Sequence, residues 1–142
     1  MSAIVSDIPD GFELAEGRGP FSRNNGPYYR RSLGGRLQTG LSVEERHCNG
    51  LGFLHGGMTA AFADSAMAWA VWNSARQASV TMRLSIDYLQ PVRIGDWLIA
   101  EARVTGVDGD IVYVDAELTR NEKQKIAGVS GVFHLIRKKE KS

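Results

Sequence analysis

The chain has 142 residues, with 17 Lys and Arg against 16 Asp and Glu, so its formal net charge is +1. This length fits one domain, and a content of 43% hydrophobic and 23% charged residues is ordinary for a globular protein. The balanced charge argues against a nucleic-acid binder, which needs a basic excess.

Residues 1–11 contain neither the basic nor the apolar region of a secretory signal. The longest apolar stretch, residues 58–71, contains Asp64 and is shorter than a membrane span requires. The single cysteine, Cys48, cannot form an internal disulfide. We therefore expect a cytoplasmic protein without a membrane partner.

Residues 1–34 are rich in Gly, Pro and Asn in their second half, which predicts an irregular N-terminal lead-in. A first strand is expected over residues 35–44, followed by a loop through residues 47–50. The main domain is expected to span residues 35–137, and the lysine-rich residues 138–142 to form a basic tail.

The clearest helix follows His55-Gly56-Gly57. From Met58 to Ala75 the chain has no Gly or Pro and many alanines, which are the best helix formers. The segment is apolar on nearly all sides, which predicts a buried helix.

After this helix the hydrophobic period changes to two. Strands are expected over residues 80–88, 97–105, 112–118 and 126–137, with a hairpin turn at Asp108-Gly109-Asp110. The short connections favour antiparallel pairing. The predicted fold class is therefore α+β, with one long helix against an antiparallel sheet.

Asp64 is the first candidate for chemistry, because a carboxylate inside an apolar helix loses hydration when it is buried. Either Asp64 lies on a narrow exposed stripe of the helix, or it acts as a general base in a cleft that excludes bulk water.

The Gly56-Gly57 pair is the second candidate. Amides of a first helical turn have no partners within the helix, and the helix dipole adds positive potential there. Such a helix start either binds an oxyanion or is an ordinary glycine-rich bend.

Gly56 and Asp64 are eight residues apart, so their Cα atoms lie ~12 Å apart along a helix axis. One reacting carbon cannot contact both groups of the same helix. If both act on one substrate, the carboxylate comes from a second copy of the chain, and a two-fold dimer forms two such sites. Pairing in the dimer would also cover the edge of the sheet.

Other patterns are weaker. His47 and Cys48 are adjacent in an extended segment and point in opposite directions, which disfavours a catalytic pair. The three histidines lack the spacing of a zinc site, so we expect no metal. Neither dinucleotide nor nucleotide phosphate fingerprints are complete, so we expect no cofactor. Thr81 falls on the polar face of its predicted strand.

Together, the run from His47 to Gly57, Asp64 seven residues later, and the segments 79–82, 87–91 and 95–96 resemble the hotdog-fold acyl-CoA thioesterases of the phenylacetate-pathway (PaaI-like) type. The similarity covers about Leu37 to Leu135. It implies a five- or six-stranded antiparallel sheet wrapped around the helix. It also implies homodimers that often pair into tetramers, and hydrolysis of acyl-CoA with coenzyme A as part of the substrate.

The resemblance also implies catalytic roles. Asn49 matches an asparagine that binds the thioester carbonyl, and Gly56 matches the donor of the oxyanion hole. His55 matches a histidine near the thioester, and Asp64 the acid that activates water or attacks directly. Thr81 matches a residue that assists the water.

Substrate contacts are expected at Gly57, Tyr88 and Arg93, of which Arg93 is a candidate for a coenzyme A phosphate. Two other functions stay open: a hotdog hydratase or dehydratase, and a non-catalytic acyl-CoA-binding protein. The acyl group is not indicated by the sequence.

Overall fold

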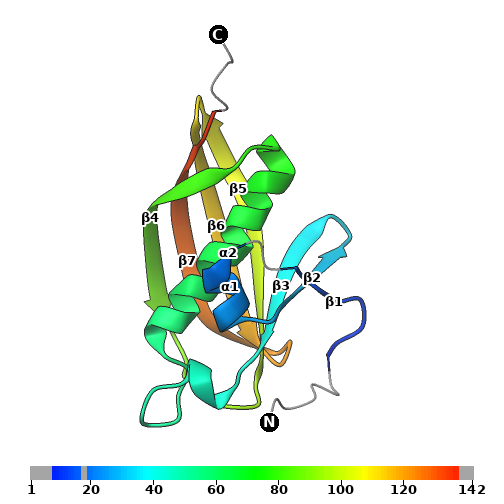
Figure 1. Cartoon of the computed structure of the whole chain (residues 1–142), viewed down its shortest axis with the longest axis vertical. Coiled ribbons are helices and arrows are strands. Elements are labelled where there is room, and N and C mark those ends of the chain that lie inside the picture. Colours follow the sequence, from blue (N-terminus) through cyan, green and yellow to red (C-terminus); the bar gives the residue numbers. More distant parts are fainter. Residues whose placement is uncertain (1–7, 17–18, 138–142) are drawn as a thin grey trace.

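The computed structural model describes residues 8–16 and 19–137, in which one antiparallel sheet packs against one long helix (Figure 1). The strands are β1 (Glu13–Leu14), β2 (Tyr28–Leu33), β3 (Arg36–Ser42), β4 (Ser79–Tyr88), β5 (Trp97–Asp108), β6 (Ile111–Arg120) and β7 (Gln124–Leu135). The helices are α1 (Pro20–Asn25), a single 3-10 turn (Glu45–His47) and α2 (Gly56–Ala75).

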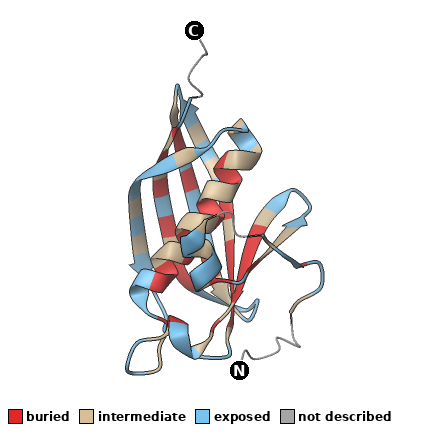
Figure 2. Cartoon of the chain, viewed as in Figure 1, coloured by how far each residue is buried: buried red, intermediate tan, exposed pale blue. Residues whose placement is uncertain are grey.

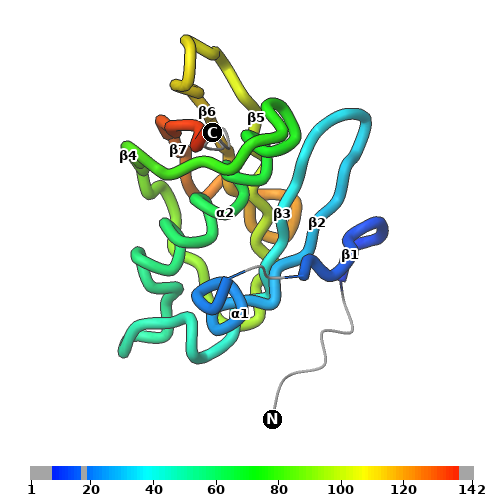
Figure 3. The backbone as a smooth tube through the Cα atoms, turned by 45° about the horizontal axis from the view of Figure 1, so that its top comes forward, coloured from blue at the N-terminus to red at the C-terminus, as the bar shows by residue number. Residues whose placement is uncertain are grey.

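The strand order is β1-β2-β3-β5-β6-β7-β4, and every neighbouring pair is antiparallel. The sheet curves around α2, with β4 at one end and the β1–β2–β3 group at the other (Figure 3). The α+β class and the helix within an antiparallel sheet are confirmed. The sheet has seven strands, however, rather than five or six.

The additional strands come from the segment that we expected to be irregular. Residues 8–16 and 19–34 contain β1, α1 and β2, so the prediction of an irregular lead-in over residues 1–34 was wrong for this described part. Pro20 occupies the first turn of α1, where its missing N–H costs nothing. Gly34 and Gly35, both at positive φ, connect β2 to β3. The predicted basic tail, residues 138–142, lies outside the described residues.

Helix α2 is buried on one side only. The buried residues are Met58, Thr59, Phe62, Ala63, Ala66, Met67, Ala70 and Val71. On the opposite side lies what we call the open stripe, whose members are all half-buried: Ala61, Asp64, Ser65, Ala68 and Trp72. The prediction of a helix buried on all sides is therefore corrected: within one chain, the sheet covers only part of its circumference.

Strand β4 differs from the other long strands of the sheet. It is an edge strand with no buried residue, whereas buried residues concentrate on α2 and on the central strands beneath it (Figure 2). Val80 and Met82 are 48% and 62% exposed. An exposed strand of ten residues carries unpaired backbone groups along its free edge.

A register shift between Thr81 and Arg83 interrupts β4. Such a bulge inserts one residue and changes which side chains face the core. Beyond it, Leu84 and Ile86 pack on the core, whereas before it Thr81 contacts α2. Thr81 is therefore not on the outer face that strict alternation predicted.

Two kinds of element are absent from the described residues. No helix there has the length and apolar composition that a membrane crossing requires. No group of three or more His, Cys, Asp or Glu side chains that could hold a metal ion lies within residues 8–16 and 19–137.

Candidate active site

The loop before α2 is organised by Asn49. Its carboxamide oxygen accepts hydrogen bonds from the amides of Leu51 (3.0 Å) and Phe53 (3.1 Å). Because the oxygen is occupied by the loop, the exposed carboxamide nitrogen of Asn49 is the group available to donate to a ligand.

His55 caps the N-terminus of α2. Its Nδ1 accepts from the amide of Gly57 at 2.8 Å, so the proton of the neutral ring is on Nε2. The carbonyl of His55 accepts from the amide of Thr59 at 3.0 Å. This bond orients the peptide between His55 and Gly56, because the carbonyl and the amide of one peptide point in opposite directions.

Tyr88 completes this arrangement from β4. Its hydroxyl donates to the carbonyl of Gly56 at 2.7 Å. The peptide between Gly56 and Gly57 is thus held at both ends, by Tyr88 at the carbonyl and by His55 at the amide. No acceptor among the described residues contacts the amide of Gly56, which leaves it as a free donor at the first turn.

Asp64 lies two turns further along α2, on the open stripe. Its carboxylate accepts a hydrogen bond from the hydroxyl of Thr81 on β4. Thus the two residues that the sequence placed on different elements are in contact, and Thr81 keeps the carboxylate at the β4 side of the stripe.

Tyr28 is a neighbour of this carboxylate that the sequence did not indicate. It is buried on β2 with its ring packed edge-on against Phe62, at 5.7 Å between centroids. Burial raises the pKa of Tyr28, and the negative charge of Asp64 raises it further. The pairing of β2, which lies in the predicted lead-in, with β3 brings Tyr28 over the helix.

Of the predicted substrate contacts, Arg93 lies beside the Asn49 loop. Its guanidinium stacks over the Phe53 ring at 5.1 Å, and its amide donates to the Asp96 carboxylate at 2.9 Å. The amide of Gly57 is committed to His55 and the hydroxyl of Tyr88 to Gly56, so neither group is free for a ligand in this arrangement.

His47 is a buried structural residue. Its Nδ1 accepts from the Glu44 amide (3.0 Å), so Nε2 donates to the Asn25 carbonyl (2.7 Å). Burial lowers the pKa of His47, and its carbonyl accepts from the amide of His55 at 2.9 Å. His47 therefore joins α1, through its ring, to the start of α2, through its backbone carbonyl.

The remaining nucleophile and base candidates are accounted for by internal bonds. The thiol of Cys48 donates to the Glu44 carbonyl at 3.4 Å, and burial raises its pKa, which disfavours a thiolate. Among the described residues, no histidine is hydrogen-bonded to a carboxylate, the pair that a hotdog hydratase would use.

One chain therefore holds two separate half-sites. Amide donors gather at the start of α2, and the Asp64–Thr81 pair lies eight residues, or ~12 Å, along the helix axis. Neither half-site alone combines an oxyanion donor with a carboxylate.

Comparisons with known proteins relate this chain to thioesterases and esterases. The family model described as the thioesterase superfamily matches residues 51–127. A putative esterase from Pseudomonas aeruginosa is 33% identical over 134 residues, which cover 92% of this chain and 99% of that protein.

Two further relatives are informative. The acyl-coenzyme A thioesterase PaaI of Escherichia coli is 32% identical over 68% of each chain. The E. coli PaaI structure superposes with a TM-score of 0.76 over 84% of this chain and 86% of that one, at 27% identity. A Bacillus halodurans protein crystallised with CoA gives a TM-score of 0.65 at 26% identity, covering 70% and 66% of the two chains.

Proposed function

Because this chain belongs to the thioesterase superfamily and has its hotdog fold, we propose that it hydrolyses acyl-CoA thioesters to a free acid and coenzyme A. The observation that carries the proposal is the arrangement around the start of α2, where the Gly56 amide and the Asn49 carboxamide nitrogen are left as free donors. Two such donors, if both reach the thioester, suit a carbonyl oxygen that becomes an oxyanion.

In this mechanism Asp64 takes a proton from water as the water oxygen bonds to the thioester carbon. The Gly56 amide and Asn49 stabilise the tetrahedral oxyanion. The carbon–sulfur bond then breaks, and the proton passes to the leaving thiolate. Thr81 holds the carboxylate in position, and His55, at the same helix start, lies near the leaving group.

We further propose that two copies of the chain build each site. The free edge of β4 pairs with the same edge of a second copy, and the open stripe of α2 faces the partner. The exposed, unpaired edge strand and the half-buried stripe beside it support this dimer. A two-fold axis near the middle of the stripe brings Asp64 to the Gly56 amide of the partner subunit.

The test is a thiol-release assay with aromatic, short, medium and long acyl-CoAs, comparing wild type with Asp64→Asn. The amide keeps the size of the side chain and removes its basicity. We expect kcat to fall by about 10²–10⁴, the range for a lost general base, with a much smaller change in KM.

Asp87→Asn, an exposed carboxylate on the same strand as Thr81, is the matched control and should retain wild-type kcat. Near-normal turnover of Asp64→Asn would remove the assignment of Asp64. Tight binding of acyl-CoA without any turnover of wild type would replace the hydrolase with a binding protein.

A further inference from the structure

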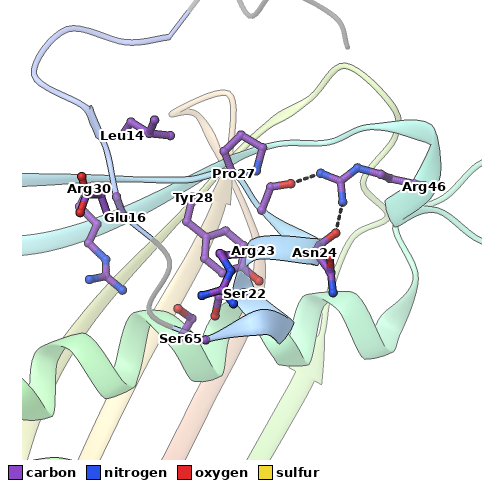
Figure 4. Close-up of a pocket in the computed structure, with 13 residues that line it drawn as sticks. Leu14, Glu16, Ser22, Arg23, Asn24, Pro27, Tyr28, Arg30, Arg46 and Ser65 are labelled. Carbon is purple, nitrogen blue, oxygen red and sulfur yellow. Dashed lines mark hydrogen bonds between the residues drawn. The ribbon is translucent and has the colours of Figure 1, made fainter. Parts of the chain in front are cut away.

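A cavity of about 980 Å³ lies between the N-terminal elements and α2. Its walls come from β1, α1 and β2, and Ser65 of α2 contributes to its floor (Figure 4). This volume is at the upper end of the range for small-molecule sites. Nothing in the mechanism above uses it.

The cavity is adjacent to the proposed catalytic carboxylate. Ser65 follows Asp64 directly, so the two side chains leave α2 about 100° apart, on either side of the open stripe. Asp64 also contributes to the raised pKa of Tyr28, whose ring stands over the helix beside Ser65 (Figure 4). An acyl group bound at Asp64 can therefore extend across the small Ala61 and Ala68 side chains into the cavity.

Hydrogen-bond donors converge in this cavity. The side chains of Ser22, Arg23, Tyr28 and Ser65 lie together in it (Figure 4). Within the described part of the chain, none of these four side chains donates a hydrogen bond to a protein acceptor.

The charge of the cavity is positive. Three arginines, Arg23, Arg30 and Arg46, line it against one acidic residue, Glu16. Arg30 stacks on the Trp69 ring at 4.9 Å, and Arg46 is bound to the carbonyls of α1 and its cap. Arg23, on the last turn of α1, is therefore the cation best placed to reach a ligand.

The walls of the cavity also lie outside residues 51–127, the part of the chain that matches the family model. The match covers residues 51–127, and Ser65 is the only lining residue within it. The matched part thus holds Asp64, Gly56 and Thr81, whereas the cavity depends on residues 14–16 and 19–30 and on Arg46.

Building on the proposed function, we propose that this cavity binds the far end of the acyl group and selects acyl chains that end in a carboxylate. Three hydroxyl donors and a guanidinium match an anionic oxygen group, and charge-assisted hydrogen bonds of this kind are among the strongest in proteins. The substrate class is therefore the CoA thioesters of dicarboxylic acids.

The test compares adipoyl-CoA with hexanoyl-CoA and suberoyl-CoA with octanoyl-CoA, which differ only in the terminal carboxylate. Arg23→Gln should lower kcat/KM for the dicarboxylic substrates about tenfold, which corresponds to about 1.4 kcal/mol. The monocarboxylic substrates should change less than twofold. Tyr28→Phe, which removes only the hydroxyl, should act in the same direction with a smaller effect.

Arg36 is an exposed arginine on β3 that does not line the cavity, so Arg36→Gln is the matched control. It should leave the ratio of kcat/KM between the dicarboxylic and the monocarboxylic substrate unchanged in both pairs. Equal losses on both members of each pair would overturn the proposal.

The 3′-phosphate of coenzyme A is the other anion that the cavity could bind, and dephospho-CoA thioesters lack it. If Arg23→Gln causes no loss with these thioesters, the cavity binds coenzyme A and the acyl-end assignment is wrong. Suppose that hexanoyl-CoA is hydrolysed normally but wild type does not prefer the dicarboxylic member of either pair. That result would reject this inference and leave the proposed hydrolase intact. Absence of thiol release from every substrate would reject the hydrolase itself.

Discussion

The first turn of α2 and its middle carry the two halves of the proposed site, and they differ in how they are held. At the first turn, His55, Thr59 and Tyr88 fix successive peptide groups by hydrogen bonds within the chain, and Asn49 fixes the loop that precedes it. In the middle, Asp64 has Thr81 as its hydrogen-bond partner and lies on a half-buried stripe.

The physical reason for the difference is the kind of group that each half presents. Amide donors stabilise an oxyanion only if they are oriented before the reaction, so their orientation has to be built into the chain. A catalytic carboxylate needs a position that water and substrate reach. Burying its charge without a hydrogen-bonding partner would lower the stability of the fold. The donors of the first half are therefore oriented within one chain, whereas we propose that a partner subunit encloses the second half.

The largest effect that tests this comparison comes from mixed dimers. Asp64→Asn inactivates one half-site, and Asn49→Asp inactivates the other while keeping an oxygen that accepts from the Leu51 and Phe53 amides. Each variant alone should show at most a few percent of wild-type thiol release. After subunit exchange, random pairing should restore about a quarter of the sites, because half of the dimers are mixed and each has one intact site.

Exchange is verified by native mass spectrometry of tagged and untagged subunits. Confirmed mixed dimers without recovered activity would show that both half-sites act within one chain. Recovery that also occurs with Thr81→Val in the Asn49→Asp chain would show that Thr81 does not belong to the carboxylate half.

A smaller effect is expected from Tyr88→Phe. Loss of the hydrogen bond to the Gly56 carbonyl frees one end of the peptide beside the oxyanion donor. A net contribution of about 1 kcal/mol predicts a decrease of about fivefold in kcat, with KM unchanged, in steady-state assays.

The same experiment distinguishes positioning from substrate binding, the role that the sequence predicted for Tyr88. A raised KM at constant kcat would assign Tyr88 to binding and reject the positioning role. Tyr113 lies on β6 and is 44% exposed, so Tyr113→Phe is the matched control. It should change neither kcat nor KM.

The smallest effect concerns the stability of the first half-site. The pKa of His47 is lowered by burial, so between its folded and unfolded pKa values the unfolded chain binds more protons. The free energy of unfolding should therefore fall as the pH decreases below about 6.5, the unfolded pKa of histidine, with a slope of at most about 1.4 kcal/mol per pH unit.

Urea unfolding between pH 5 and pH 7.5 measures this slope. His47→Gln should flatten it, whereas His134→Gln, at a half-buried position on β7, should retain it. A slope that survives in His47→Gln would assign the acid sensitivity to another group.

Thr81 illustrates where prediction from the sequence stopped. Alternation of polar and apolar residues placed it on the outer face of its strand, but the bulge after Thr81 reverses the phase and brings its hydroxyl to Asp64. The resemblance to thioesterases indicated its role, whereas the periodicity did not. A bulge depends on the register of the neighbouring strand, β7, which is distant in the sequence.

The N-terminal segment was missed for a related reason. β2 has tyrosines and arginines rather than a regular apolar pattern, and it forms because it pairs with β3 across the Gly34-Gly35 turn. Its prediction as an irregular segment hid Tyr28, α1 and the cavity that they form with α2.

By itself, the sequence determined the elements whose patterns are local: the alanine-rich helix, four later strands, the hairpin at Gly109 and the residues of the thioesterase motif. Local patterns suffice there because helix propensity and strand alternation act between residues close in the chain. Only the tertiary structure decided which side of α2 the sheet leaves open, which peptide groups Tyr88 and His55 hold, and how residues 14–16 and 19–30 line a cavity at Ser65, beside Asp64. These features depend on contacts between distant segments, whose geometry is set by strand register and packing rather than by any local run of residues.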